Sequence, residues 1–294
     1  MGLGQAGFVR LSGQSAIVTG ASLGLGRAIA RTFVREGASV LLIARGEADL
    51  DDARNELTTM AGPGQAVTSM AADISVATTG PAAAARVAQL PGRFSILVNN
   101  AGVIGPIGAF DAADLDTWLH AVEINFLGAI RMCHAVLPRF RAQQFGRIIN
   151  VSGGGATSPR PNFSAYAAAK TALVRFTETL AEEVRDQDIT ANAVAPGALN
   201  TRMLDDVIRA GATRTGDDVQ REAEAQQRNG GASPDHAAAL VAFLASADSG
   251  QITGRLISAR WDPWEQLAER SDELNDTDIY TLRRITPGDR GRTW

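Results

Sequence analysis

A tyrosine and a lysine lie four residues apart in the segment YAAAK, Tyr166–Lys170. Residues i and i+4 of a helix share one face, so the Lys170 ammonium can approach the Tyr166 phenol oxygen. A free tyrosine has a pKa of about 10, too high for a base near neutral pH, and an adjacent cation favours the phenolate. The pair is therefore typical of an acid/base that transfers a proton to or from a reacting group.

Lys170 is the only lysine among 28 basic residues. The general use of arginine indicates a coding bias rather than a chemical requirement. Against that bias, one retained lysine indicates a position that needs a compact ammonium close to a phenolate, which a planar guanidinium cannot provide. The alternative is the chance survival of one surface lysine.

A second segment, TGASLGLG at Thr19–Gly26, is suited to a phosphate-bearing ligand. Its glycines at 20, 24 and 26 allow a tight turn and a close approach of the backbone. The N-terminus of the helix that follows offers free N–H groups to a pyrophosphate. Because the turn joins a predicted strand to a predicted helix, it indicates a dinucleotide site more strongly than a glycine-rich loop alone would.

Arg45 follows the second predicted strand, where a site that prefers NAD usually has Asp or Glu for the ribose 2′-hydroxyl. An arginine there can pair with the 2′-phosphate of NADP. We therefore expect NADP(H), with NAD(H) less favoured. The alternative is a solvated arginine in an arginine-rich chain.

The elements that must position these residues alternate along the chain. A helix is predicted over Leu25–Glu36, closed by Gly37. Strands that alternate with helices indicate an α/β protein, with a doubly wound parallel sheet covered by helices on both faces. Residues 200–233 and the tail after Trp261 are expected to be irregular. The predicted strands are Ser15–Thr19, Ser39–Ala44, Ala66–Asp73, Ser95–Gly102, Gly146–Ser152, Ile189–Gly197 and Gly254–Ala259.

Six motifs occur in an order that is typical of one enzyme family. They are the turn at Thr19–Gly26, Asp73 after the third strand, NNAG at Asn99–Gly102, Asn125 in EINFLGA, YAAAK at Tyr166–Lys170, and APG at Ala195–Gly197 followed by Thr201. In these motifs the chain resembles a short-chain dehydrogenase/reductase, and their order and separations fit that family along Ser12 to about Ala259. The resemblance implies a single-domain Rossmann-like fold, a nicotinamide cofactor and a homotetramer or homodimer.

The resemblance also implies roles for individual residues. Tyr166 would be the acid/base, Lys170 would bind the nicotinamide ribose and lower the pKa of the tyrosine, and Asn125 would hold a water in a proton relay. Asp73 and Ile74 would flank the adenine, and Pro196 to Thr201 would touch the carboxamide end. The whole cofactor-binding set would be Gly20, Ser22, Leu23, Gly24, Leu25, Gly26, Arg45, Asp73, Ile74, Asn99, Ala101, Gly102, Tyr166, Lys170, Pro196, Gly197 and Thr201.

The chain departs from the family at one catalytic position. The family has a serine where this chain has Gly153, thirteen residues before Tyr166. In one account, the glycine run Gly153–Gly155 permits an irregular backbone that swings Ser152 into the site. In the other, no serine acts, and Tyr166 with backbone N–H groups of the glycine run holds the substrate oxygen. We favour the second, because neighbouring side chains on a strand face opposite ways, and we then expect Gly153→Ser to fit without strain.

The substrate is expected to be a small carbonyl compound or alcohol. Gly153 and Gly154 are candidate substrate contacts, and Arg160 would face an anionic or polyhydroxylated substrate unless it is simply solvated. The leading expectation is an NADP(H)-dependent oxidoreductase that interconverts a ketone and a secondary alcohol. The alternatives are an epimerase or dehydratase that acts through a transient ketone, and a non-catalytic cofactor-binding protein.

Composition limits the class of protein. One cysteine among 294 residues excludes an internal disulfide, and Met1–Ser12 lacks the apolar run of a secretion signal. The chain has a net charge of −4, no basic blocks and no long apolar stretch. We therefore expect a cytoplasmic protein that binds neither nucleic acid nor membrane. We assign no metal ligands. Residues 1–261 would form the catalytic domain, and residues 262–294 an extension that packs on it or on a neighbouring subunit.

Overall fold

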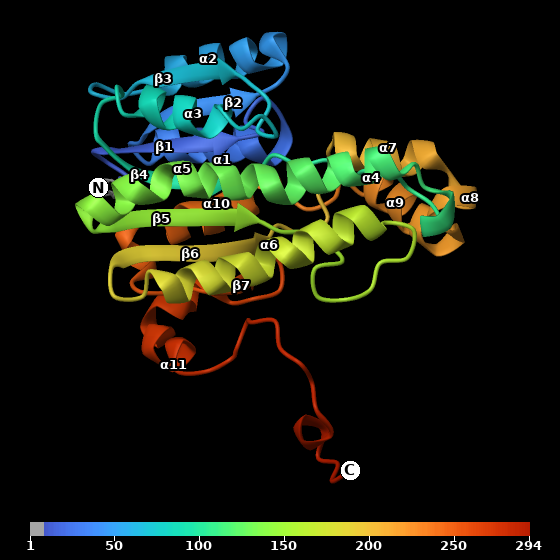
Figure 1. Cartoon of the computed structure of the whole chain (residues 1–294). Coiled ribbons are helices and arrows are strands. Elements are labelled where there is room, and N and C mark those ends of the chain that lie inside the picture. The colour runs from blue at the N-terminus through green and yellow to red at the C-terminus, as the bar shows by residue number, and fades with distance from the viewer. Residues whose placement is uncertain (1–8) are drawn as a thin grey trace, which may run out of the picture.

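The fold is built on one parallel sheet of seven strands, seen in a computed structural model that describes residues 9–294 (Figure 1). The expectation about a secretion signal falls partly on residues 1–8, outside the described residues. All seven predicted strands occur, with the order β3-β2-β1-β4-β5-β6-β7 in the sheet. Their bounds are β1 Gln14–Thr19, β2 Ser39–Ala44, β3 Val67–Ala71, β4 Arg93–Asn99, β5 Phe145–Val151, β6 Asp188–Ala195 and β7 Leu256–Ser258.

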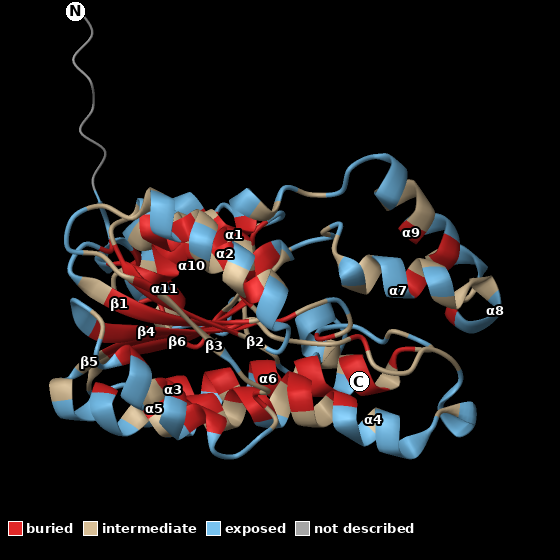
Figure 2. Ribbon diagram, turned by 90° about the horizontal axis from the view of Figure 1, so that it is seen from above, coloured by how far each residue is buried: buried red, intermediate tan, exposed pale blue. Residues whose placement is uncertain are grey.

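Helices cover both faces of the sheet (Figure 2). Two hydrophobic cores result, one under α1, α2 and α10 and the other under α3, α5 and α6. The predicted doubly wound α/β fold is therefore confirmed. The helices, including short ones, are α1 Gly24–Arg35, α2 Glu47–Met60, α3 Thr79–Val87, η1 Phe110–Ala112, α4 Leu115–Val122, η2 Glu123–Leu127, α5 Gly128–Gln143, α6 Ser164–Glu183, α7 Arg202–Ala210, α8 Ala212–Thr215, α9 Asp217–Arg228, α10 Pro234–Ala245, η3 Ala247–Ser249, η4 Trp264–Arg270, α11 Ser271–Asn275 and η5 Pro287–Arg290.

The alternation of side chains along the central strands explains why their sequences are continuously apolar. Val18 of β1 lies in the core under α1, whereas its neighbour Ile17 lies in the core under α5. Successive side chains of a strand point to opposite faces, and here both faces are buried.

The sheet reverses its direction of winding between β1 and β4, which pair directly. In a doubly wound sheet, the crevice outside the carboxyl ends of the strands at such a point is where ligands bind. The loops after β1 to β6 all start at this edge, and these loops with the helices that follow them carry the predicted site residues.

Residues 200–233 are not irregular, and the prediction for this segment was wrong. They form α7, α8 and α9, which lie beyond the carboxyl ends of the strands (Figures 1 and 2). The polar composition concealed an apolar stripe at helical spacing, because Met203, Leu204, Val207 and Ile208 join one hydrophobic cluster with Tyr166. We call α7–α9 the lid.

The tail after Trp261 also contains short helices rather than only irregular chain. Trp264 is buried against Phe243 of α10, whereas Trp261 is 74% exposed. The buried Arg255 donates to the carbonyl oxygens of Leu274, Thr277 and Ile279, and so ties the tail to the end of the sheet.

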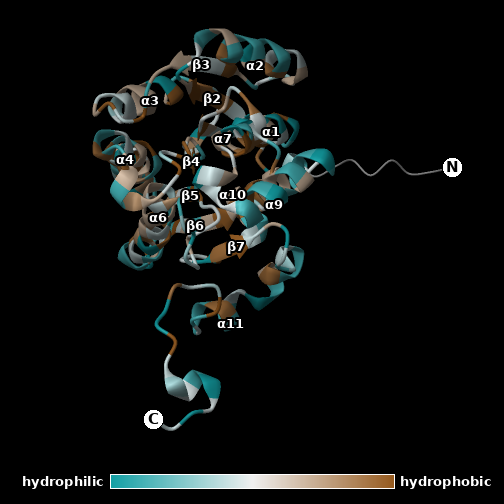
Figure 3. Ribbon diagram, turned by 90° about the vertical axis from the view of Figure 1, so that its right-hand side faces the viewer, coloured by the Kyte–Doolittle hydropathy of each residue, from teal (hydrophilic) through white to brown (hydrophobic). Residues whose placement is uncertain are grey.

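The last part of the tail leaves the body of the domain. Up to Leu282, whose N–H donates to Glu178 Oε1 at 2.6 Å, the tail contacts α6 and β7. Beyond it the chain extends away from β7 and α11 (Figure 3). Within residues 9–294, no helix is long and apolar enough to cross a membrane.

Candidate active site

Tyr166 and Lys170 lie one turn apart on α6, as the spacing predicts, and both side chains are buried. The Lys170 ammonium donates to the carbonyl oxygen of Val151 at 2.7 Å. It lies 5.8 Å from the centre of the Tyr166 ring. The end of β5 therefore fixes the lysine on the face of α6 that carries the tyrosine.

The expectation that Lys170 lowers the pKa of Tyr166 names a different cation from the one whose charge acts on the tyrosine in this structure. Burial raises the pKa of Tyr166, and the cation that partly offsets this rise is Arg160, whose guanidinium carbon lies 5.9 Å from the ring centre. Burial also lowers the pKa of Lys170 to about 8. Burial thus disfavours the charged form of both side chains.

Gly153 lies directly against the Tyr166 hydroxyl. A Cβ atom built on Gly153 would be 2.1 Å from the tyrosine Oη, far closer than atoms can approach. The tyrosine therefore occupies the space into which a side chain at 153 would project. The expectation that Gly153→Ser fits without strain was wrong, because a strand pattern cannot show what fills that space.

Ser152 does not reach the tyrosine. Its hydroxyl is buried and has no hydrogen-bond partner within residues 9–294. The backbone N–H of Ser152 continues the pairing of β5 with β6 by donating to Val194 at 2.8 Å. The strand is regular at this position, so no bulge swings the serine into the site.

Asn125 lies in a π-helical turn, η2, between α4 and α5. Its amide nitrogen donates to the carbonyl oxygens of Val103 and Ala121, each at 2.8 Å, and its oxygen accepts from the Val103 N–H at 3.1 Å. A π-turn inside a helix often marks a functional site. Here the turn positions the Asn125 side chain against the loop after β4. One amide hydrogen bonds to that loop at Val103, and the other bonds to α4 at Ala121.

The glycine-rich turn after β1 forms a cradle that larger residues would fill. A Cβ atom built on Gly26 would be 2.1 Å from the carbonyl oxygen of Gly20. Leu23, which precedes α1, offers no side-chain cap, and the first turn of α1 has no acidic residue. The helix N-terminus, with Gly24 and Leu25 as its first residues, is thus open to an anion.

Two residues that the sequence analysis did not assign fix this turn. The Thr19 hydroxyl accepts from the N–H groups of Asn100 and Ala101, at 3.0 and 3.1 Å. The Asn100 amide donates to the carbonyl oxygens of Thr19 and Gly20. Asn100 is the second asparagine of the NNAG motif, and the motif alone does not show which of its two asparagines contacts the glycine-rich turn.

Asn99 lies behind the crevice rather than in it. Its amide donates to Asn150 Oδ1 at 2.9 Å, and the Asn150 amide donates in turn to Thr177 Oγ1 at 2.8 Å. This buried network joins β4 to β5 and α6. Asn99 is therefore placed as a brace between the strands that carry the cofactor crevice and the tyrosine.

A cavity of about 170 Å³ follows the crevice from the glycine-rich turn to the ends of β2 and β3. Arg45 lies at this end, with Nη1 at 3.9 Å from Asp73 Oδ2, and its side chain is 60% exposed. Burial alone would raise the pKa of Asp73, but hydrogen bonds from Ser75 and the charge of Arg45 lower it. The predicted residues brought together here are Gly20, Ser22, Arg45, Asp73, Ile74, Ala101 and Gly102.

The segment after β6 reaches the same crevice from the other side. Pro196 and Gly197 lead to Thr201, whose methyl group would be 3.4 Å from a Cβ built on Gly24. Arg202, which the sequence analysis missed, lines the cavity and pairs with Asp49 of α2 at 2.9 Å. This ion pair links the first turn of the lid to the end of the crevice where Arg45 lies.

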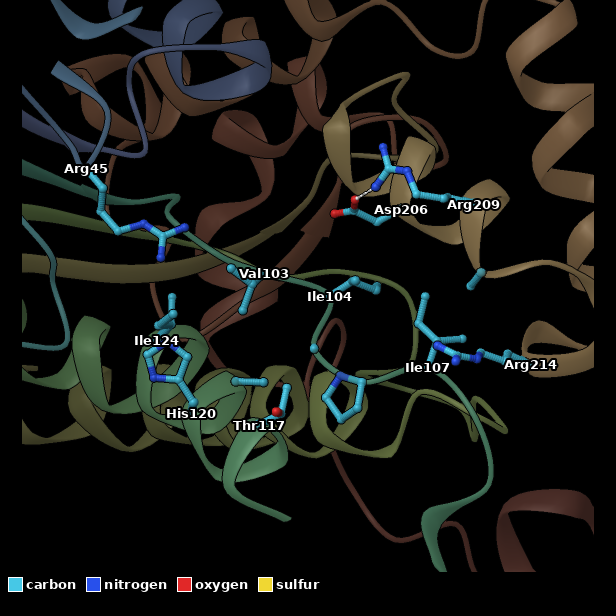
Figure 4. A pocket seen from close by; sticks show the side chains of 14 residues that line it. Arg45, Val103, Ile104, Ile107, Thr117, His120, Ile124, Asp206, Arg209 and Arg214 are labelled. Atoms are coloured by element: carbon cyan, nitrogen blue, oxygen red, sulfur yellow. Dashed lines mark hydrogen bonds and ion pairs between the residues drawn. The ribbon is translucent and has the colours of Figure 1, made fainter. Parts of the chain in front are cut away.

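A larger cavity of about 450 Å³ opens between α4, the loop after β4 and the lid. Figure 4 shows Arg45 at one side, with Arg209 and Arg214 of the lid at the other and His120 of α4 below. Ile104 and Ile107 on its wall pack with Tyr166. Taken together, the open helix N-terminus, the glycine cradle and the two cavities fit a nicotinamide dinucleotide with room for a small ligand beside it.

Comparisons with known proteins agree with this geometry. The family model described as short chain dehydrogenase matches residues 14–211. Oxidoreductase UcpA of Salmonella typhimurium is 36% identical over 248 residues, covering 83% of this chain and 92% of the relative. Dehydrogenase/reductase SDR family member 4 of Homo sapiens is 32% identical over 250 residues, covering 84% and 86%. The crystal structure of NAD+-bound xylitol dehydrogenase superposes with a TM-score of 0.77 at 25% identity, covering 85% of this chain and 98% of that one.

Proposed function

The chain belongs to the short-chain dehydrogenase/reductase family, and from this we propose that it is an NADP(H)-dependent oxidoreductase that interconverts a ketone and a secondary alcohol. The observation that carries the proposal is the juxtaposition of Tyr166 and Lys170 with the glycine-lined crevice. The amine of Lys170 would be 3.6 Å from a Cβ built on Gly102, which lines that crevice. A proton-transferring group therefore lies beside the place where the cofactor would bind.

The chain's own residues would move and hold the proton. A bound nicotinamide supplies or accepts the hydride. Tyr166 donates its hydroxyl proton to the substrate oxygen in reduction and accepts a proton in oxidation. Lys170, held by Val151, places its charge on the same face of α6. The lid leaves Tyr166 only 6% exposed, so the reacting group is shielded from water.

The proposal is tested by a substrate screen. Purified protein is mixed with NADPH and a panel of ketones, or with NADP+ and the corresponding alcohols, and absorbance of the reduced cofactor is followed. Product analysis in parallel detects an epimerase or dehydratase, which would convert substrate without net change in the cofactor. A protein that binds the cofactor yet converts no member of the panel would count against the enzyme assignment.

Arg45 is expected to select the phosphorylated cofactor. NADPH should bind more tightly than NADH, because the guanidinium can pair with the 2′-phosphate. Arg45→Ala should narrow the difference by about 1–3 kcal/mol, the scale of a charge-assisted contact. Dissociation constants of both cofactors for the two proteins measure this directly. Equal affinities in the unchanged protein would refute the preference.

We also propose that the protein acts in the cytoplasm as a homotetramer or homodimer. Two observations support this. The single cysteine, Cys133, is buried and free. Leu115 and Leu119, on α4, are 59% and 52% exposed, and Phe110 just before them is 64% exposed. A group of exposed apolar side chains of this kind is typical of a surface that another subunit covers.

A further inference from the structure

Arg160 has no acidic partner among residues 9–294. Its guanidinium lies over the ring of Phe163, with 4.2 Å from Cζ to the ring centre, and 5.9 Å from the ring centre of Tyr166. The side chain is half-buried, and burial lowers its pKa. Within residues 9–294 it makes no ion pair and donates no hydrogen bond to another residue. A half-buried guanidinium that the chain leaves unpaired is free to bind an anionic ligand.

The two most deeply buried arginines, by contrast, have hydrogen-bond partners within the chain. Arg147 pairs with Asp188 at 2.8 Å and donates to two backbone carbonyls. Arg255 donates to three carbonyl oxygens of the tail. Arg160 differs from these two arginines, because its guanidinium N–H groups have no hydrogen-bond acceptor within residues 9–294.

The glycine run beside Arg160 also has donors to spare. Within residues 9–294, no hydrogen bond uses the N–H groups of Gly153, Gly154 or Gly155, although the Gly153 carbonyl accepts from Ala156. A Cβ atom built on Gly154 would be 3.5 Å from Nη1 of Arg160. The glycine run thus lies next to both the Arg160 guanidinium and the Tyr166 hydroxyl, and successive backbone N–H groups with no partner in the chain can contribute to an anion site.

The loop that carries these donors is fixed in place. The Thr171 hydroxyl of α6 donates to the carbonyl oxygens of Ala156 and Ala167, at 3.2 and 2.8 Å. The Phe163 N–H donates to the Arg160 carbonyl oxygen. Pro159 and Pro161 restrict the backbone on either side of the arginine. Little ordering is needed when a ligand binds, which favours affinity.

We propose that Arg160 and the N–H groups of Gly153–Gly155 form a subsite for a substrate carboxylate beside Tyr166. The substrate is then an oxo acid or a hydroxy acid whose carboxylate lies a few bonds from the reacting carbon. A planar guanidinium matches a carboxylate with two parallel hydrogen bonds, and backbone N–H groups add further donors. Several apolar side chains, from the lid and from Ile104 and Ile107, pack in one cluster with Tyr166. The inference rests on the proposed function in taking Tyr166 as the acid/base.

The test measures binding without turnover, so that it stands apart from the proposed reaction. Protein saturated with NADP+ is titrated by calorimetry with benzoylformate, a 2-oxo acid, and with methyl benzoylformate, its uncharged ester. The unchanged protein should bind the acid more tightly than the ester. Arg160→Gln should raise the Kd of the acid about 10–100-fold, the scale of lost charge-assisted hydrogen bonds, and leave the Kd of the ester unaltered.

Arg139→Gln is the matched control, because it removes the same charge from an exposed position near the C-terminal end of α5. It should change neither Kd. If Arg160→Gln folds poorly, the comparison of acid with ester in the unchanged protein still tests the subsite. The subsite is refuted if the unchanged protein binds the acid no more tightly than the ester. It is also refuted if Arg160→Gln raises the Kd of the acid and the Kd of the ester by the same factor.

A second readout separates anion binding from an effect on the tyrosine. The chain has only two tyrosines, so Tyr280→Phe leaves Tyr166 alone to report its phenolate absorbance during a pH titration. A rise in the pKa of Tyr166 in Arg160→Gln with no change in the Kd of benzoylformate would show that the arginine acts on the tyrosine, and would overturn the subsite. Turnover of neutral ketones alone would leave the proposed function standing while refuting this inference.

Discussion

Tyr166→Phe is expected to lower kcat by about 10²–10⁴-fold, the usual contribution of a positioned acid/base. The change removes one hydroxyl and keeps the ring that packs against Phe163, Ile104 and the lid. Cofactor affinity and melting temperature should therefore stay close to those of the unchanged protein. Steady-state rates on the best substrate of the screen, with cofactor binding followed in parallel, measure both quantities.

Lys170→Arg should also be severely impaired although it conserves the charge. The ammonium fits between the Val151 carbonyl oxygen and Gly102, and it is only 3% exposed. A planar guanidinium needs more room and more acceptors than this position provides. Arg139→Gln serves again as the control for a remote basic residue. Substantial activity in Tyr166→Phe would refute the mechanism, whereas activity in Lys170→Arg alone would refute only the specific need for lysine.

The sheet could be predicted because its strands are buried on both faces. Runs such as Ser39–Ala44 are continuously apolar, and the glycine and polar residues that follow them mark where each strand ends. The segment at 200–233 could not be predicted by the same reasoning. Its helices bury only a narrow stripe against the site and expose charged residues elsewhere, so composition alone indicated a loop.

The proximity of Tyr166 and Lys170 could be predicted, because their spacing places them on one face of one helix. The position of Arg160 could not, because it depends on a loop between two prolines folding back until the guanidinium lies over Phe163. The same holds for Arg202, which approaches Asp49 across 153 positions of the sequence. Contacts between distant segments leave no periodic signal, and these are the contacts that place charge in the crevice.

The space in front of Gly153 is the clearest case of a feature that only three dimensions reveal. On a strand pattern, the missing serine looks like a gap left open for substrate. In the folded chain the Tyr166 hydroxyl fills it, at 2.1 Å from the point where a Cβ would stand. A side chain at position 153 could therefore be accommodated only if the Tyr166 side chain moved from the place it has in this structure.

Gly153→Ala and Gly153→Ser are accordingly both expected to lower kcat, by about 10²-fold, because a misplacement of roughly 1 Å at the reacting group is worth about that much. The added Cβ must push the Tyr166 hydroxyl aside, and because the ring is buried, that shift also disturbs the side chains packed against it. Ser152→Ala, one residue earlier, should change kcat less than a few-fold, since its buried hydroxyl makes no hydrogen bond that would be lost. Rates for the three variants on one neutral ketone, with melting temperatures to exclude unfolding, test the contrast.

A Gly153→Ser enzyme as fast as the unchanged protein would mean that the tyrosine moves away from this position when substrate binds. A large loss of kcat in Ser152→Ala would mean that Ser152 performs the role of the family's serine.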